Sequence, residues 1–224
     1  MKDKILNITN GDYFNNYFLQ KYGKPSVAFC EDMMDGNAVS DIYSDDFIKF
    51  RSSELNVTIA EYREKMHVFD ALNENIFQNL CLWFGKDTFC QMNLLTLLAY
   101  LEQTEFCGKV SLNYIDDETF EIIEKNIDVP LGFYKKVYED ILISGKLPRN
   151  LGVLDRNAIN LYFDYKSDNG NLSRLVRENA DKDKTALLIL LMENSKEYGL
   201  SDIQAEKIID RILNSRNGFD EVIV

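Results

Sequence analysis

Three groups of polar residues each follow a short apolar segment in the first hundred residues of this chain. Asn10-Gly11-Asp12 follows the first segment, Glu31-Asp32 follows the second, and Asp87 and Gln91 follow the third. Carboxylate and amide oxygens bind hydroxyl groups of small molecules or a hard divalent cation such as Mg²⁺. If the apolar segments are neighbouring strands of one sheet, these groups meet and form a polar ligand site.

The elements that would position these groups are strands connected by helices. Apolar runs predict strands at Lys4–Thr9, Ser26–Cys30, Asn79–Phe84 and Lys109–Tyr114, and helical spacing predicts helices at Tyr13–Tyr22 and Thr88–Gln103. Strands that alternate with helices favour a parallel sheet with right-handed crossovers. Ligands bind outside the carboxyl ends of such strands, which is where the polar groups lie. The opening strand–helix–strand unit favours the strand order 2-1-3-4.

The sequence predicts that the second half of the chain is helical. A long polar loop at Glu31–Asp46 and helices at Phe47–Leu55 and Ile59–Leu72 precede the third strand, and strand signals stop after Pro130. Helices are then predicted at Phe133–Ser144, Asp155–Asp164, Asn171–Asn179, Thr185–Glu197 and Ser201–Asn214. We expect an α/β fold, with an N-terminal parallel, Rossmann-like three-layer sheet followed by an all-helical C-terminal portion. The expected domains are residues 1–129 and 130–224.

Each polar group also has a purely structural interpretation. Asn10-Gly11-Asp12 is typical of a tight turn followed by a helix cap, and Asp87 also suits a helix N-terminus. Glu31-Asp32 fits a solvated loop as well as it fits a ligand site. Trp83, the only tryptophan, is more often a core residue than a platform for a ligand ring.

Composition narrows the classes of function. The 224 residues are 46% hydrophobic, and 37 acidic against 25 basic residues give a net charge of −12, which disfavours nucleic-acid binding. Four cysteines lack the spacing of a metal site and favour reduced thiols in the cytoplasm. No membrane span is expected, and the apolar run after Met1–Lys4 is too short for a signal peptide. Nothing in the sequence specifies an oligomeric state.

Several familiar catalytic patterns are missing from the sequence. There is no GxGxxG dinucleotide fingerprint, no P-loop and no HExxH zinc motif. A Ser-His-Asp or Cys-His arrangement would have to use His67, the single histidine, which lies among charged residues of a predicted helix. A surface or packing role is favoured for that histidine.

Five segments together resemble the bacterial domain-of-unknown-function 1835 family. Ile5–Asp12 (ILNITNGD) is similar to the opening motif of that family, and Val27–Gly36 (VAFCEDMMDG) is similar to its second motif. Arg51 lies where the family has an arginine that opens a helix. Leu82–Leu95 (LWFGKDTFCQMNLL) resembles the third and most specific motif, and Leu190–Ile209 loosely resembles the usual C-terminal ending.

The resemblance covers nearly the whole chain and implies an α/β domain followed by helices. It implies no particular activity. In the second motif Asn37 stands where the family has proline, so the loop geometry is expected to differ. The resemblance and the strand-end argument together select these candidate ligand-binding residues: Asn10, Gly11, Asp12, Asp32, Arg51, Trp83, Asp87 and Gln91.

Three hypotheses of function follow from these residues. The first is a protein that binds or processes a phosphorylated or nucleotide-like small molecule, with Mg²⁺ as the cofactor to consider and Arg51 pairing a phosphate or clamping Asp32. The second is a transcriptional regulator, because Gly199-Leu200-Ser201 between two helices resembles part of a helix-turn-helix. The third is a structural or interaction module without catalysis.

Overall fold

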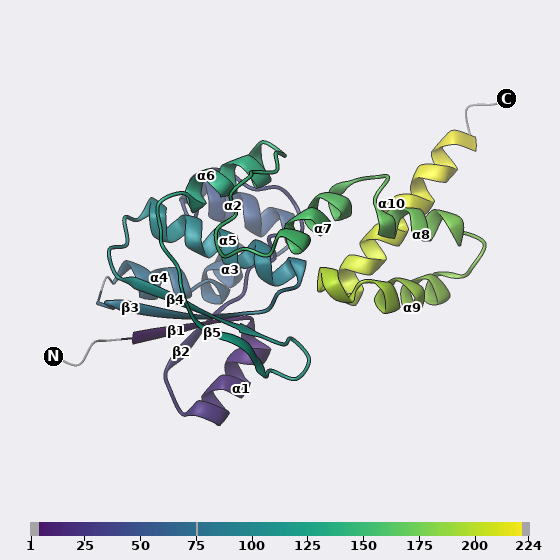
Figure 1. Cartoon of the computed structure of the whole chain (residues 1–224). Coiled ribbons are helices and arrows are strands. Elements are labelled where there is room, and N and C mark those ends of the chain that lie inside the picture. Colours follow the sequence, from purple (N-terminus) through teal and green to yellow (C-terminus); the bar gives the residue numbers. More distant parts are fainter. Residues whose placement is uncertain (1–4, 75, 221–224) are drawn as a thin grey trace.

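The computed structural model describes residues 5–74 and 76–220, with side chains described up to residue 214, and contains one five-stranded sheet (Figure 1). The strands are β1 (Ile5–Asn10), β2 (Ser26–Phe29), β3 (Asn79–Phe84), β4 (Lys109–Ile115) and β5 (Ile122–Asp128). Their order is β2-β1-β3-β4-β5, and β1 to β4 are parallel, as expected. Lys4, the expected start of the first strand, lies outside the described residues.

The fifth strand, β5, was not expected from the sequence. It pairs antiparallel with β4 and forms one edge of the sheet. Most of its side chains are exposed, so it lacks the apolar pattern that identifies a buried strand. The positive φ of Asn126 (56°) interrupts it further. The β4–β5 hairpin matters because it carries acidic residues to the carboxyl edge of the sheet.

Helices cover the two faces of the sheet unequally, which gives the expected three layers (Figure 1). On one face α1 (Asp12–Tyr22) packs Phe14 and Phe18 against Trp83 and Ile115. The other face carries the main core, in which α5 is buried along most of its length. The helices of that layer include α2 (Asp45–Glu54), α3 (Ile59–Lys65), α4 (Val68–Asn73) and α5 (Thr88–Gln103). The single helix expected at Ile59–Leu72 is therefore two, because the chain leaves helical geometry at Met66.

The C-terminal half, after β5, consists of helices and loops, without a strand among the described residues. Its elements are α6 (Tyr134–Tyr138), the π-helical turn η1 (Glu139–Ile143), α7 (Arg156–Lys166), α8 (Asn171–Glu178), α9 (Lys184–Asn194), the 3₁₀ turn η2 (Lys196–Tyr198) and α10 (Asp202–Asp220). In Figure 1, α6 lies with the sheet and its helices, whereas α8, α9 and α10 form a separate group reached through α7. None of the described helices has the length and apolar character needed to cross a membrane.

Glu102, near the end of α5, fixes the beginning of α6. Its carboxylate accepts hydrogen bonds from the backbone N–H groups of four successive residues, at 2.6 to 2.9 Å. These are Gly132, Phe133, Tyr134 and Lys135. One side chain thereby satisfies the unpaired N–H groups that begin a helix. Packing thus continues across Val129–Pro130, where the sequence pattern changes.

Candidate functional site

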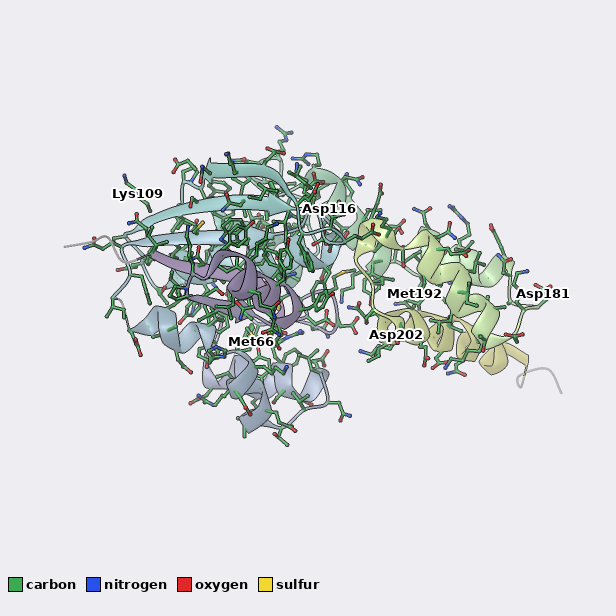
Figure 2. The ribbon with its side chains drawn as sticks, turned by 90° about the horizontal axis from the view of Figure 1, so that it is seen from below. Met66, Lys109, Asp116, Asp181, Met192 and Asp202 are labelled. Carbon is green, nitrogen blue, oxygen red and sulfur yellow. The ribbon has the colours of Figure 1, made fainter. Side chains whose placement is uncertain are left out.

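A pocket of about 720 Å³ opens at the carboxyl ends of β3 and β4. One wall comes from the sheet and the hairpin after β4, and the other comes from α7 and the α9–η2 segment. Figure 2 shows Asp116 at the end of the sheet that faces the helical group, with Lys109 at the opposite end of the same strand. The pocket therefore lies where the sheet and the C-terminal helices meet.

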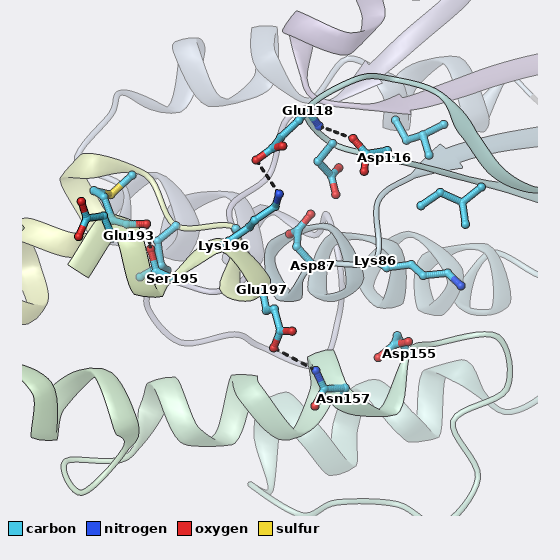
Figure 3. Close-up of a pocket in the computed structure, with 16 residues that line it drawn as sticks. Lys86, Asp87, Asp116, Glu118, Asp155, Asn157, Glu193, Ser195, Lys196 and Glu197 are labelled. Carbon is cyan, nitrogen blue, oxygen red and sulfur yellow. Dashed lines mark hydrogen bonds and ion pairs between the residues drawn. The ribbon is translucent and has the colours of Figure 1, made fainter. Parts of the chain in front are cut away.

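The lining of this pocket is strongly negative. It includes two lysines and seven acidic residues, namely Asp87, Asp116, Asp117, Glu118, Asp155, Glu193 and Glu197. Both lysines are already paired: Lys196 with Glu118 at 2.9 Å (Figure 3) and Lys86 with Glu124. A low-dielectric cleft lined by one sign of charge concentrates ions of the opposite sign. The pocket is suited to positive charge.

Two carboxylates that line the pocket meet a buried thiol. Polar atoms of Asp87, Cys90 and Asp117 all lie within 4.8 Å of one another. Asp87 caps α5 by accepting a hydrogen bond from the Cys90 N–H at 2.8 Å. Asp117, on the β4–β5 hairpin, accepts a hydrogen bond from Cys90 Sγ at 3.3 Å. Two segments of chain thus bring like charges together.

The closeness of these groups and their burial raise the pKa values of Asp117 and Cys90. Loss of hydration and the neighbouring Asp87 raise the pKa of Asp117 to about 8. Burial also raises the pKa of Cys90 well above its ordinary value, so the thiol stays protonated and acts as a donor. Asp117 is therefore largely protonated near neutral pH. Asp117 can exchange that proton for a bound cation, or transfer it to a ligand.

Two glycines allow the carboxylates to come so close to the main chain. A Cβ on Gly85 would fall 2.0 Å from an oxygen of Asp117, and a Cβ on Gly199 would fall 2.2 Å from an oxygen of Asp87. Gly199 also has a left-handed φ of 68°. Residues from the β3–α5 turn, the hairpin and the turn before α10 are thus fitted around one pair of carboxyl groups.

Asn10 connects this cluster to the interior. Its amide donates to Cys90 Sγ at 2.9 Å, and its oxygen accepts from Asn93 at 2.9 Å. Asn93 also donates to the backbone oxygen of Glu31 at 2.6 Å. Asn10, expected at the site from the sequence, therefore supports the cluster from behind and does not line the pocket.

Arg51 is a buried structural residue. Its Nε and Nη2 donate to one oxygen of Glu31, while Nη1 and Nη2 also donate to the backbone oxygens of Asp32, Asp35 and Asn37. These bonds use the five N–H donors of a guanidinium group. No donor is left for the phosphate that the sequence analysis allowed, and the clamp holds the backbone of Asp32.

The acidic loop held by Arg51 contacts the C-terminal helices. Gln204 donates from its amide to both carboxylate oxygens of Asp32, at 3.1 Å each. Asp35 accepts from the Tyr165 hydroxyl at 2.5 Å and from Lys207. Burial, with a contribution from Asp35, raises the pKa of Asp32 to about 6. Asp32 therefore bonds a helix of the same chain instead of lining the pocket at β3 and β4.

Asp12 and Gly11 lie away from the carboxylate pair. Asp12 pairs with Lys65 of α3 at 3.0 Å, and this contact lowers the pKa of Asp12. Asp12 borders a different, open groove formed largely by charged residues of α3 and α4. Gly11 precedes α1 with a left-handed φ of 78°, and its N–H donates to the backbone oxygen of Phe29. The expected turn explains Gly11, but the expected cap is wrong, because Gly11 is the N-cap residue of α1 and the Asp12 side chain pairs with Lys65.

Trp83 and Gln91 also have structural partners. Trp83 packs against Phe18 and Tyr22, with ring centroids 5.0 and 5.6 Å apart, and donates to Asn7. Gln91 is fully buried, where it donates to the backbone oxygen of Gly85 at 2.6 Å and accepts from the N–H of Asp155 at 2.8 Å. It joins the turn after β3 to the start of α7.

Of the eight candidate residues, Asp87 is the one that lines the pocket. Sequence reasoning missed Asp117 and Cys90 as its partners, and Gly85 and Gly199 as the residues that give them room. The Asp116-Asp117-Glu118 run directly after the fourth strand was an available signal for Asp117. Cys90 gave no such signal, because its thiol faces the cluster only once α5 is placed.

Comparisons with family models, curated proteins and solved structures returned no match for this chain. The resemblance to the domain-of-unknown-function 1835 family therefore stays a prediction.

Proposed function

We propose that this protein binds a small polar molecule in the pocket at the carboxyl ends of β3 and β4. The observation that carries the proposal is geometric: polar atoms of Asp87, Cys90 and Asp117 lie within 4.8 Å of one another beside a pocket with seven acidic lining residues. Any ligand bound in this pocket must place positive charge next to Asp87 and Asp117. An ammonium group on the ligand supplies such charge, and so does a divalent cation.

A phosphorylated or nucleotide-like ligand, as expected from the sequence, remains part of the proposal under one condition. Phosphate carries the same sign of charge as the lining, so a divalent cation must lie between them. Mg²⁺ binds through one or two carboxylates together with phosphate oxygens, which suits this arrangement. The proposed location is the cytoplasm, on the cysteine usage of the sequence.

The test is a thermal-shift series on the native protein. Mg²⁺ and Mn²⁺ are added alone and with nucleotides or sugar phosphates, and small aliphatic amines are added without metal. A ligand at ~100 times its dissociation constant adds about 2.7 kcal/mol and raises the midpoint measurably. Stabilisation by amines alone would identify a cationic ligand, and stabilisation that needs metal would identify the phosphorylated class.

The matched variants are Asp117→Asn and Asp12→Asn. Asp117→Asn removes the carboxylate that can exchange its proton for a cation, so it should abolish the rise in midpoint, whereas Asp12→Asn changes a separate groove and should preserve it. A rise that both variants retain, or a phosphorylated compound that stabilises without metal, would contradict the proposed site.

A structural or interaction module without catalysis is the second candidate function. It is favoured because Arg51, Asp32, Trp83 and Gln91 all bond to other parts of the same chain. If no compound in the series changes the midpoint, this function is the better one.

DNA binding through α10 is supported less well. Lys207 pairs with Asp35, and Arg211 lies 3.9 Å from Asp168 and donates to Ser173. A mobility-shift assay at low salt tests this alternative directly, because phosphate contacts are strongest there.

A further inference from the structure

Helix α9 is apolar on all sides, yet little of it is buried. Ala186–Met192 is an unbroken apolar run, and within it Leu187 and Leu191 are buried in the core. Ile189 is 55% exposed and Met192 is 39% exposed. A helix that is apolar all round is typical of one with packing partners on more than one side. In this structure α9 packs against α8 and α10, and Ile189 and Met192 stay exposed.

The exposed side of α9 continues onto α10. Lys184 of α9 lies 3.5 Å from Glu206 and 3.0 Å from Asp210 of α10. Leu188 lies one helical turn after Lys184 and is half-buried, with part of its side chain packed against the core. Ile203 lies one turn before Glu206 and is 65% exposed. We use the name α9 patch for Leu188, Ile189, Met192 and Ile203. Contiguous apolar surface with a polar rim is typical of an interaction site.

The rim of the α9 patch is negative. Asp202, Glu206 and Asp210 follow along α10, and Glu193 lies one turn after Ile189 on α9. Lys184 lies beside these acidic residues and is already paired with Glu206 and Asp210. Figure 2 shows Met192 and Asp202 on the helical group, near the end that meets the sheet. The rim favours an occupant that carries positive charge.

We propose that the α9 patch docks a basic amphipathic helix of another protein. The apolar face of such a helix would cover Ile189 and Ile203, and its lysine or arginine residues would meet the acidic rim. A second copy of this chain is disfavoured, because it brings the same rim and a net charge of −12. An anionic membrane surface is disfavoured for the same reason. Met192 and Glu193 also line the pocket beside β3 and β4, whereas Ile189 and Ile203 do not, so these two residues test the patch separately from the pocket.

Fluorescence anisotropy with a labelled probe peptide tests this assignment. The probe has about five helical turns of leucine and lysine in amphipathic order. One control peptide has the same composition in scrambled order, and another has glutamate in place of lysine. The double variant Ile189→Ser/Ile203→Ser removes apolar surface and leaves the pocket lining intact. The matched control is Leu19→Ser/Ile59→Ser, which changes two exposed apolar residues of α1 and α3.

We expect saturable binding of the basic amphipathic probe that weakens as salt is raised. The patch variant should lose at least about tenfold in affinity, whereas the control variant should match the native chain. Thermal midpoints of both variants verify that they fold. Equal binding of the scrambled peptide, or no loss in the patch variant, would overturn the proposal. Self-association or anionic-vesicle binding that the patch variant abolishes would assign the patch to another occupant and also overturn it.

Discussion

Arg51 and Glu31 form an ion pair that is shielded from solvent on both sides. Nε and Nη2 of Arg51 approach the same oxygen of Glu31, at 3.1 and 2.8 Å, and the Tyr62 hydroxyl donates to the other oxygen. The remaining donors of Arg51 hold the loop that carries Asp32 and Asp35. The pair therefore supports the segment on which the C-terminal helices rest.

Replacing Arg51 by methionine should be strongly destabilising. The substitution leaves Glu31 charged in the interior without its partner, and breaking a buried pair in this way costs ~3–5 kcal/mol. Urea denaturation followed by circular dichroism measures the change in unfolding free energy. Arg63→Met is the control, because Arg63 forms an exposed pair with Asp45 whose loss should cost less than ~1 kcal/mol. Similar losses in both variants would refute the structural role of Arg51.

The Asp87–Asp117 pair should make stability depend on pH. The pKa of Asp117 is about 8 in the folded protein and near ~3.9 in an unfolded chain. Between these values the unfolded state binds fewer protons, so the native protein should lose stability as pH rises from ~4 to about 8. Asp117→Asn does not titrate and should gain stability relative to the native protein over that range. Thermal midpoints across the range test this.

Asp116→Asn is the control, because Asp116 should change the stability of the protein with pH in the opposite direction to Asp117. Hydrogen bonds from Thr119 lower the pKa of Asp116, so its contribution to stability is present above ordinary carboxyl pKa values and is lost in acid. This variant should therefore be less stable than the native protein at neutral pH. If the two variants have the same pH profile, the raised pKa of Asp117 is wrong.

Gly85→Ala should separate the two carboxylates. The new Cβ would fall 2.0 Å from an Asp117 oxygen, and that flexible side chain can move away more easily than the strand. We expect the Asp117 pKa to fall toward its ordinary value, as measured by NMR titration of the carboxyl carbons. In an Asp117→Ser background the same substitution should have little further effect on stability. An unchanged Asp117 pKa would mean that Gly85 does not control the contact between Asp87 and Asp117.

Contacts with the acidic loop should determine how firmly the C-terminal helices are held. Tyr165→Phe removes one hydrogen bond to Asp35, and Lys207→Met removes another. Each loss should weaken the contact by about 1 kcal/mol and raise amide exchange in α8 to α10 roughly fivefold, with little change in the sheet. Arg174→Met, which breaks an exposed pair with Glu178 within α8, is the control and should leave exchange unchanged.

The parallel part of the fold could be predicted because its strands are buried. The four parallel strands and the helices between them have continuous apolar runs or helical spacing. Their order was only a guess from the opening strand–helix–strand unit, and the structure has that order. β5 could not be predicted in the same way, since an exposed edge strand has no apolar alternation. The break at Met66 was missed because Ile59–Leu72 has helical spacing throughout.

The site was harder to predict because residue types do not specify partners. Asp87 was found from its position after β3, but its role depends on Asp117, which a hairpin brings to the same edge. Arg51 was selected as a ligand-binding candidate, either for a phosphate or as a clamp on Asp32. That its donors are all taken could be known only from the loop that surrounds it. Contacts between distant segments decided which polar residues remained free for a ligand.

The capping of α6 by Glu102 bears on how the chain can be divided for expression. A fragment that ends at residue 129 would lose the four N–H groups that the Glu102 carboxylate accepts, and would uncover the face of α5 on which Tyr134 and Tyr138 are buried. An autonomously folding fragment with the complete sheet must therefore extend through α6, beyond the residues that supply its strands.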